Sequence, residues 1–321
     1  MIQVKNLSKY YGEKIGVQDI DFTVARGEIM GLLGPNGSGK TTIMKIMTGH
    51  LPPSAGTVIV DGYDILTAPK EVTGRIGFLP EAPPLYPEMK VAEYLHFCAT
   101  IKGVQRGRRN ERVGQTMKMV SVADVRDRLI RNLSKGYKQR VGLAQAMISD
   151  PPILILDEPT VGLDPKQITE VRQLIARLGQ ERTVVLSSHM LAEVGMVCRR
   201  LVILNKGRIA AMDTTEKLAS GIADTGRFLL TVKAAPDETG QVLASVGGIR
   251  SFRLLEAVPQ ANKGYCSFVI ENDKNSEARE NLSRALAGRG IPIIEMRSAG
   301  VTLEETFLQL TGGSSPESAD S

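Results

Sequence analysis

The chain has 321 residues, of which 42% are hydrophobic and 23% are charged. This is an ordinary globular composition, and the length predicts one large or two ordinary domains. The 40 basic and 35 acidic residues leave a net charge of only +5, which argues against a dedicated nucleic-acid-binding stripe. The three cysteines, Cys98, Cys198 and Cys266, are widely spaced, so a disulfide framework and a cysteine zinc site are both disfavoured.

Two absences bear on membranes. The first residues, Met1–Asn6, lack the apolar segment of a secretory signal. No stretch approaches the roughly 18–20 consecutive apolar residues of a transmembrane helix. We therefore expect a cytoplasmic chain, and any action at a membrane would require another chain that spans it.

Up to about residue 220, short apolar segments alternate with helical stretches. Several segments are nearly continuous Ile, Leu and Val runs, the pattern of strands covered on both faces, which predicts an α/β sheet with packed helices. A first domain is expected over 1–224, with a helical subdomain at about 90–150. Its strands are expected at Ile2–Asn6, Gln18–Ala25, Glu28–Leu33, Thr57–Val60, Arg75–Leu79, Pro152–Leu156, Thr183–Ser187 and Arg200–Leu204.

A second, smaller domain is expected over 225–311. Its elements follow the order β-α-β-β-α-β, which is typical of the ferredoxin-like α+β plan. A further helix is expected at Leu303–Leu310, and the Gly-, Ser- and acid-containing tail 312–321 is expected to be disordered. The main elements are expected at Phe228–Val232, Glu238–Ser245, Ile249–Leu255, Tyr265–Ile270, Ser276–Ala287 and Pro292–Met296.

Residues 34–41 read GPNGSGKT and fit the pattern GxxxxGK[ST]. Glycines let successive N–H groups surround phosphate oxygens, and the following helix directs its positive end at the same anion. Lys40 is expected to reach the β- and γ-phosphates, and the Thr41 hydroxyl to ligate Mg²⁺. A chance glycine turn is the alternative, but a predicted strand precedes the loop and a predicted helix follows it. Nucleotide contacts are expected from Gly34, Pro35, Asn36, Gly37, Ser38, Gly39, Lys40, Thr41 and Thr42.

A second candidate site is acidic. Asp157 and Glu158 directly follow the apolar run Ile153–Leu156, which is expected to be a strand. Ligands bind at the carboxyl ends of strands in such sheets. One acid there can hold the Mg²⁺ shell, and its neighbour can orient or deprotonate a water. A solvated acidic turn is the alternative, and the phosphate loop upstream makes it the weaker one.

These motifs resemble those of the ATP-binding subunits of ABC transporters. The resemblance covers roughly residues 1–220 and implies the P-loop NTPase fold. Residues 133–140, LSKGYKQR, resemble the family signature LSGGQ. Residues 157–164, DEPTVGLD, resemble the acidic strand end and the loop that crosses the dimer interface. Ser187-Ser188-His189 resembles the switch-histidine segment.

The resemblance implies a role for each matching residue. Glu158 resembles the general base that activates water, and His189 the residue that contacts the γ-phosphate. Tyr11 resembles the aromatic residue that stacks on adenine, and a partly buried strand-end tyrosine is the alternative.

The resemblance also implies a dimer. Ser134 and Gly136 resemble groups that contact the γ-phosphate of ATP held by the other subunit, and Asp164 lies in the loop at the interface. Two copies would sandwich two ATPs, with ATP closing the dimer and hydrolysis releasing it.

Two features depart from the family pattern. Lys135 replaces the first glycine of the signature and Tyr137 replaces its glutamine, but a cation beside phosphate is electrostatically compatible with function. Glu81 stands where the family usually has glutamine, and a carboxylate is a harder Mg²⁺ ligand than an amide. With Glu81 in that place, the expected Mg²⁺ ligands are Thr41, Glu81 and Asp157.

Partner surfaces are expected outside the nucleotide site. In the family, the loop 82–87 adjoins a groove for a helix of the membrane permease, and Leu85 and Tyr86 offer apolar anchors, unless the loop folds on its own protein. A basic cluster in the helical subdomain either faces anionic lipid headgroups or is a solvated face. The cluster comprises Lys102, Arg106, Arg108, Arg109 and Arg112.

The Leu-Pro-Glu segment, the Lys-Gly-Tyr signature and the small C-terminal domain resemble single-cassette exporters of the gliding-motility and multidrug types. Such subunits drive a separately encoded membrane permease. A soluble ABC ATPase acting on ribosomes or nucleic acid is the alternative, but one phosphate loop and no long heptads disfavour it. A non-catalytic nucleotide sensor is the third hypothesis, against which the retained catalytic residues argue.

Overall fold

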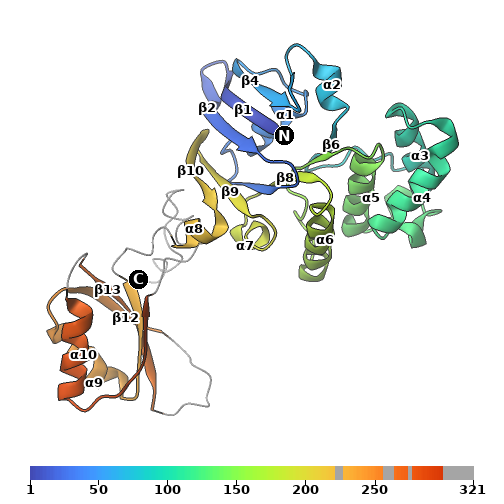
Figure 1. Ribbon diagram of the computed structural model, residues 1–321. Helices are drawn as coiled ribbons and strands as arrows, with labels where there is room; N and C mark the ends of the chain where they lie inside the picture. Colours follow the sequence, from blue (N-terminus) through green and yellow to red (C-terminus); the bar gives the residue numbers. More distant parts are fainter. Residues whose placement is uncertain (221–226, 256–263, 274–276, 299–321) are drawn as a thin grey trace. The chain divides into compact units, whose positions relative to one another are not determined.

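The computed structural model describes residues 1–220, 227–255, 264–273 and 277–298. The chain divides into two compact units, one formed by Met1–Thr215 and the other beginning at Glu216 (Figure 1). The predicted domain limits at 224 and 225 stay predictions. The expected helix at 303–310 and the expected disordered tail lie outside the described residues.

A six-stranded sheet forms the centre of the first unit, in the order β10-β9-β3-β8-β7-β6. β3, β6, β7, β8 and β9 run parallel, and β10 pairs antiparallel with β9. The residues of β7 and β8 are all buried, as the predicted apolar runs require. The strands are β3 (Ile29–Leu33), β6 (Ile76–Leu79), β7 (Ile153–Leu156), β8 (Thr183–Ser188), β9 (Arg200–Asn205) and β10 (Arg208–Thr214).

A separate antiparallel sheet has the order β2-β1-β4-β5. The sequence predicted three of its strands, but not that they form a sheet of their own. Burial alternates along these strands: Ile2 and Val4 are buried, whereas Gln3 and Lys5 between them are exposed. This alternation is that of a sheet with one covered face. The strands are β1 (Ile2–Tyr11), β2 (Lys14–Val24), β4 (Ala55–Val60) and β5 (Tyr63–Asp64).

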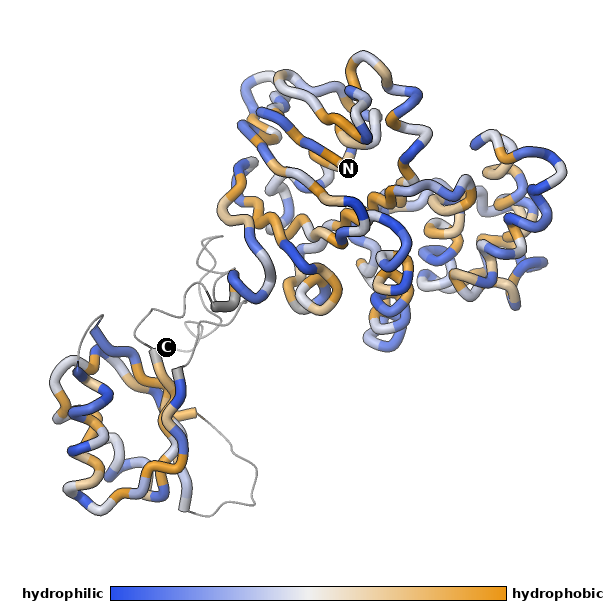
Figure 2. The backbone as a smooth tube through the Cα atoms, in the orientation of Figure 1, coloured by the Kyte–Doolittle hydropathy of each residue, from blue (hydrophilic) through white to orange (hydrophobic). Residues whose placement is uncertain are grey.

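Helices cover both faces of the parallel sheet. The main apolar core joins the antiparallel sheet, α1 and one face of the six-stranded sheet, whereas α6 and α7 lie on its other side (Figures 1 and 2). α3, α4 and α5 contact one another within the range 90–150, for which a helical subdomain is predicted. The helices of this unit are α1 (Lys40–Met47), α2 (Pro69–Thr73), α3 (Val91–Ile101), α4 (Arg109–Met119), α5 (Lys135–Met147), α6 (Pro165–Leu178) and α7 (Leu191–Val194), with short 3₁₀ turns at Arg106–Arg108, Ala123–Val125 and Ile130–Asn132. α8 (Thr215–Ser220) spans the limit between the two units.

The second unit has the element order predicted from the sequence. Its antiparallel sheet has the order β12-β13-β11-β14, and α9 and α10 pack on one face around residues such as Phe228, Phe268 and Leu282. The elements are β11 (Arg227–Val232), α9 (Pro236–Ser245), β12 (Ile249–Leu254), β13 (Cys266–Asn272), α10 (Ala278–Gly288) and β14 (Ile293–Ser298). Within the described ranges, no helix combines the length and apolar character needed to cross a membrane.

Candidate functional site

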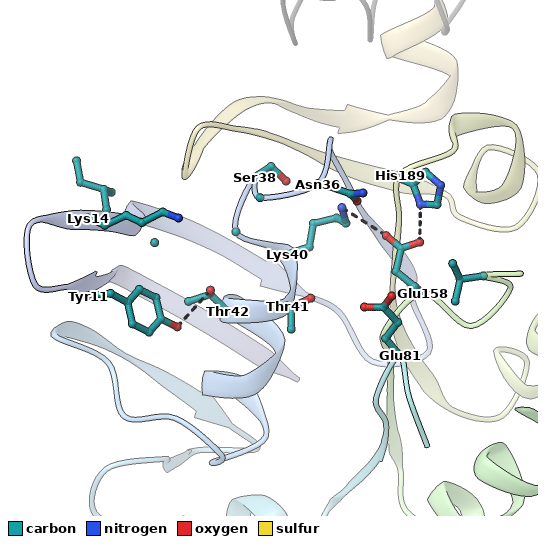
Figure 3. A pocket seen from close by; sticks show the side chains of 15 residues that line it. Tyr11, Lys14, Asn36, Ser38, Lys40, Thr41, Thr42, Glu81, Glu158 and His189 are labelled. Carbon is teal, nitrogen blue, oxygen red and sulfur yellow. Dashed lines mark hydrogen bonds and ion pairs between the residues drawn. The ribbon is translucent and has the colours of Figure 1, made fainter. Parts of the chain in front are cut away.

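The carboxyl ends of four parallel strands converge on one cleft. β3 leads into Gly34, β6 into Glu81, β7 into Asp157 and Glu158, and β8 into His189. Parallel strands end at the same edge of a sheet, so these segments meet there. The cleft has a volume of about 640 Å³ (Figure 3). Its lining includes the predicted residues Tyr11, Asn36, Gly37, Ser38, Gly39, Lys40, Thr41, Thr42, Glu81, Glu158 and His189.

The phosphate loop has the backbone geometry that its glycines predict. Gly37 has φ 80° and Gly39 has φ 107°, values that side-chain-bearing residues rarely adopt. A Cβ atom at Gly39 would lie 2.4 Å from Val17 Cγ1. The Ser38 hydroxyl is buried and has no hydrogen-bond partner among the described residues. A buried polar atom needs a partner, so a loop with this geometry fits an oxygen-rich anion.

Lys40 is the central cation of the cleft, with only 6% of its surface exposed. Its ammonium group donates to Gly34 O at 2.7 Å and to Pro35 O at 3.3 Å. It also lies 3.4 Å from Glu158 Oε1. Gly34 and Pro35 therefore hold the lysine at the base of the loop, where its charge faces the cleft.

Glu158 is buried and has a left-handed backbone, with φ 46°. Its amide N–H donates to Ser187 Oγ at 2.8 Å. The His189 ring donates from Nδ1 to Glu158 Oε2 at 2.8 Å, since a carboxylate oxygen accepts (Figure 3). Strained backbone of this kind concentrates at functional sites, where surrounding contacts hold it.

The oxygen donors predicted for Mg²⁺ lie near this pair. Asp157 is 1% exposed, and its Oδ1 accepts from Ser187 Oγ at 2.6 Å. Thr41 and Glu81 line the cleft itself. The described residues contain no cluster of three His, Cys, Asp or Glu side chains that could hold a metal. This donor set fits a hard cation that is bound by one or two protein oxygens together with substrate phosphates.

Tyr11 lies at the outer end of the cleft, at the end of β1. Its side chain is 47% exposed, and its hydroxyl is 3.5 Å from Thr42 Oγ1. Sequence reasoning missed Lys14, which pairs with Tyr11 across the β1–β2 hairpin and lines the same cleft. The short Gly12-Glu13 connection between two strands was the signal that could have found it. The other missed lining residues are Ile15, Gly16 and Val161.

Ser134, Gly136 and Asp164 lie apart from the cleft lining. Ser134 precedes α5 and accepts from the Tyr137 N–H at 3.4 Å, and Asp164 precedes α6 and accepts from the Gln167 N–H at 2.9 Å. Both side chains therefore cap helices. A Cβ atom at Gly136 would lie 2.5 Å from Gln167 Oε1, so α5 begins close beside α6 and a larger residue there would displace the Gln167 side chain.

The two substitutions in the signature have partners inside the first unit. A Cβ atom at Gly162 would lie 1.9 Å from Lys135 Nζ, so the ammonium group lies directly against the loop that follows Glu158. The Tyr137 hydroxyl donates to Asp124 Oδ2 at 2.7 Å, and this hydrogen bond raises the pKa of the tyrosine. The start of α5 thus contacts the loop 157–164 on one side and the 3₁₀ turn at Ala123–Val125 on the other.

Comparison with known proteins identifies the family. The family model described as "ABC transporter" matches residues 17–161. The ABC transporter ATP-binding protein YhcH of Bacillus subtilis is 32% identical over 99% of this chain and 98% of its own length. The chain belongs to the ATP-binding subunits of ABC transporters. The daunorubicin resistance ATP-binding protein DrrA3 of Streptomyces coeruleorubidus is also 32% identical, over 97% of this chain and 96% of its own.

Solved structures agree with this assignment over about two thirds of the chain. A structure described as the ATP-binding subunit of an ABC transporter has a TM-score of 0.63 and 30% identity, over 69% of this chain and 92% of its own. A dimeric cassette, MJ0796, described as a post-hydrolysis state bound to ADP and Pi, has a TM-score of 0.61 and 26% identity, over 67% of this chain and 99% of its own. This ABC subunit therefore has the P-loop NTPase fold, binds ATP and is an ATPase.

Proposed function

We propose that Glu158 is the general base of ATP hydrolysis in this subunit. The observation that carries the proposal is its buried carboxylate, 3.4 Å from Lys40 Nζ and 2.8 Å from His189 Nδ1, at the mouth of the phosphate loop. Lys40 attracts the β- and γ-phosphates to this position, while Glu158 accepts the proton of the attacking water. His189 orients the carboxylate from Nδ1, and its ring lines the cleft where the γ-phosphate would lie.

The remaining cleft residues bind and orient the nucleotide. The loop from Gly34 to Thr42 surrounds the phosphates with backbone N–H groups that follow Pro35, and Tyr11 stacks on the adenine ring. Thr41, Glu81 and Asp157 would hold Mg²⁺, which supplies positive charge to the phosphate oxygens when bound.

The proposal includes an ATP-dependent homodimer, or an equivalent pair with a second ATPase subunit. Ser134, Gly136 and Asp164 lie at the starts of α5 and α6, outside the cleft of their own subunit. In the dimer they complete the ATP site of the other subunit. The dimeric MJ0796 cassettes support such an arrangement.

The dimer would drive export through a separately encoded membrane permease, which would hold this subunit at the cytoplasmic face of the membrane. Relatives named for transport or resistance support this part, among them DrrA3 and the bacitracin transport ATP-binding protein BcrA of Bacillus licheniformis, which is 29% identical. Nothing in the described residues or in these relatives favours the ribosome or nucleic-acid alternative.

A second cavity is our candidate site for the permease. It has a volume of about 690 Å³, an apolar floor that includes Phe78 and Pro84, and three basic lining residues, Lys45, His50 and Lys102, with no acidic one. Lys102 Nζ donates to Gln145 O at 2.6 Å, and loss of hydration lowers the pKa of this lysine to about 8. An amphipathic helix with an acidic side chain fits this lining.

The expected anchors beside this groove are partly used within the subunit. Tyr86 is 51% exposed but packs edge-on against Phe97, with ring centroids 5.5 Å apart.

The basic cluster of the sequence analysis also has partners within the subunit. Arg109 donates to Val104 O, and Arg112 donates to Ile148 O and pairs with Asp150. These contacts favour a solvated face of the helical subdomain over lipid binding for the cluster.

The Glu158→Gln variant tests the catalytic proposal. The amide keeps the shape of the side chain but cannot accept the proton, so we expect ATP binding to persist and hydrolysis to fall at least about a hundredfold. Gel filtration with Mg-ATP should then detect a trapped dimer, which the wild-type protein forms only transiently. Hydrolysis at the wild-type rate would show that Glu158 is not the base.

A further inference from the structure

Glu193, in α7, has a buried carboxylate outside the cleft lining. Only 9% of the residue is exposed. Its Oε2 accepts from Thr160 Oγ1 at 2.5 Å and from Ser188 Oγ at 3.0 Å. Within the described part of the chain no cation pairs with it, so two hydroxyl groups compensate its burial. Burying a carboxylate is costly, and a position that does so needs a reason beyond packing.

The two hydroxyl groups belong to the segments that carry the proposed catalytic residues. Thr160 lies two residues after Glu158, and Ser188 immediately precedes His189. The Glu193 carboxylate therefore joins the loop after β7 to the end of β8. Ser187 makes a second connection between the same segments, because it donates to Asp157 and accepts from the Glu158 N–H.

These two connections lie on either side of a strained residue. Glu158 has φ 46°, a conformation that residues with a side chain adopt only when their surroundings hold it. Ser187 fixes the backbone of Glu158 itself. Glu193 fixes the chain two residues further on, and through Ser188 it fixes the residue next to His189. The 2.8 Å contact between His189 Nδ1 and Glu158 Oε2 depends on both segments keeping their places.

We propose that Glu193 is a positioning residue for ATP hydrolysis: by binding Thr160 and Ser188 together, it keeps the Glu158 carboxylate and the His189 ring aligned. The inference rests on the proposed function, in which Glu158 is the base. It predicts a defect in the chemical step with little change in ATP binding, because no atom of Glu193 lines the nucleotide cleft.

The Thr160→Val variant of the full chain is the sharpest test. It removes one hydroxyl group that binds Glu193 and nearly conserves the side-chain shape. Misplacing a catalytic group by about 1 Å can cost on the order of a hundredfold in rate, so we expect kcat for ATP to fall about tenfold or more and KM to stay within about twofold. Thr160→Ser keeps the hydroxyl group and should restore most of kcat.

Thr116→Val is the matched control. Thr116 is fully buried in α4, and its hydroxyl group has no partner among the described residues, so the same chemical change should leave kcat unaltered. Glu193→Gln should retain most activity, since one carbonyl oxygen can still accept both hydroxyl groups. Glu193→Leu should match Thr160→Val, and the double variant should be no worse than either alone, because both break the same connection.

The outcomes separate this inference from the proposed function. If Thr160→Val and Glu193→Leu keep kcat within about twofold of wild type, as the control does, Glu193 has no positioning role, while Glu158 can still be the base. The inference would also be overturned if kcat fell only in proportion to a lower unfolding temperature and Thr160→Ser and Glu193→Gln lost as much kcat as Thr160→Val and Glu193→Leu. A Glu158→Gln variant that hydrolyses ATP normally would reject the proposed function, and the inference with it. If Glu193→Leu fails to fold, Thr160→Val decides the question.

Discussion

The parallel sheet of the first unit and the antiparallel sheet of the second unit place their loops differently. In the first, β3, β6, β7 and β8 run in one direction, so their carboxyl ends meet at a single edge. In the second, every paired strand runs opposite to its neighbour, so loops are divided between two edges. All residues of the nucleotide cleft belong to the first unit. Strand direction thus decides where reactive side chains gather.

The largest loss of ATP hydrolysis that this comparison predicts follows substitution of Lys40. Lys40→Ala removes the buried cation that contacts both the loop carbonyls and Glu158. We expect ATP hydrolysis to fall at least about a hundredfold and nucleotide affinity to fall with it, because no other lysine or arginine replaces the charge inside the loop. Isothermal titration and a phosphate-release assay measure the two effects. Lys118→Ala, on the exposed face of α4, should change neither, and a similar loss in that variant would contradict the assignment.

Gly39→Ala should weaken nucleotide binding less than Lys40→Ala does, but still strongly. The residue has φ 107°, and the added Cβ would lie 2.4 Å from Val17 Cγ1. The loop must move to relieve this contact, so we expect roughly a tenfold weaker affinity for ATP and a loss of about 1–3 kcal/mol in stability.

The matched Gly→Ala substitution in the second unit should raise stability rather than lower it. Gly240 lies within α9, and a Cβ atom there would come no closer than 3.9 Å to Phe252. Gly240→Ala should stabilise the second unit by about 0.5–1 kcal/mol, since alanine favours the helix, and should leave ATP affinity unchanged. Chemical denaturation and nucleotide titration test the pair. Equal effects of the two alanines on ATP affinity would contradict the distinction between the units.

The sequence predicted those site residues that have local motifs. The GxxxxGK[ST] loop, the acids after β7 and His189 after β8 all follow parallel strands, and the structure brings them into one cleft. Lys14 and Gly16 were missed because their place depends on pairing between β1 and β2, which includes irregular register. The Gly12-Glu13 connection is a local signal for the hairpin, but the irregular register further along the two strands depends on tertiary contacts.

Other features could not be predicted for different reasons. The left-handed backbone of Glu158 has no signal in the sequence, because Gly, Asn and Asp are the residue types that commonly mark this conformation. Glu193 belongs to no motif, and its burial depends on Thr160 and Ser188 meeting across two strands. β10 was missed because it is an edge strand whose short apolar run, 209–212, is half exposed and contains two alanines, which favour strands weakly.

Tyr11 should have a modest effect on nucleotide affinity. Stacking of a base on an aromatic ring contributes about 1–3 kcal/mol, and the lower end applies to a ring that is half exposed. Tyr11→Ala should therefore weaken ATP binding about fivefold and leave kcat nearly unchanged, since the ring is remote from Glu158 (Figure 3). Tyr11→Phe should retain the affinity. The neighbouring Tyr10→Ala is the control, because Tyr10 is 41% exposed but does not line the cleft.

Phe228→Ala should have the smallest effect on ATP hydrolysis, although it should greatly destabilise the second unit. Phe228 is fully buried between the sheet and its helices, and Phe228→Ala should lower the stability of that unit by about 3–5 kcal/mol. Leu229→Ala, at the partly exposed position next to it, should cost clearly less. We expect an earlier unfolding transition by calorimetry, with ATP hydrolysis unchanged below that temperature, because no described residue of the second unit lines the cleft. Loss of hydrolysis as soon as the second unit unfolds would instead make this unit part of the catalytic machinery.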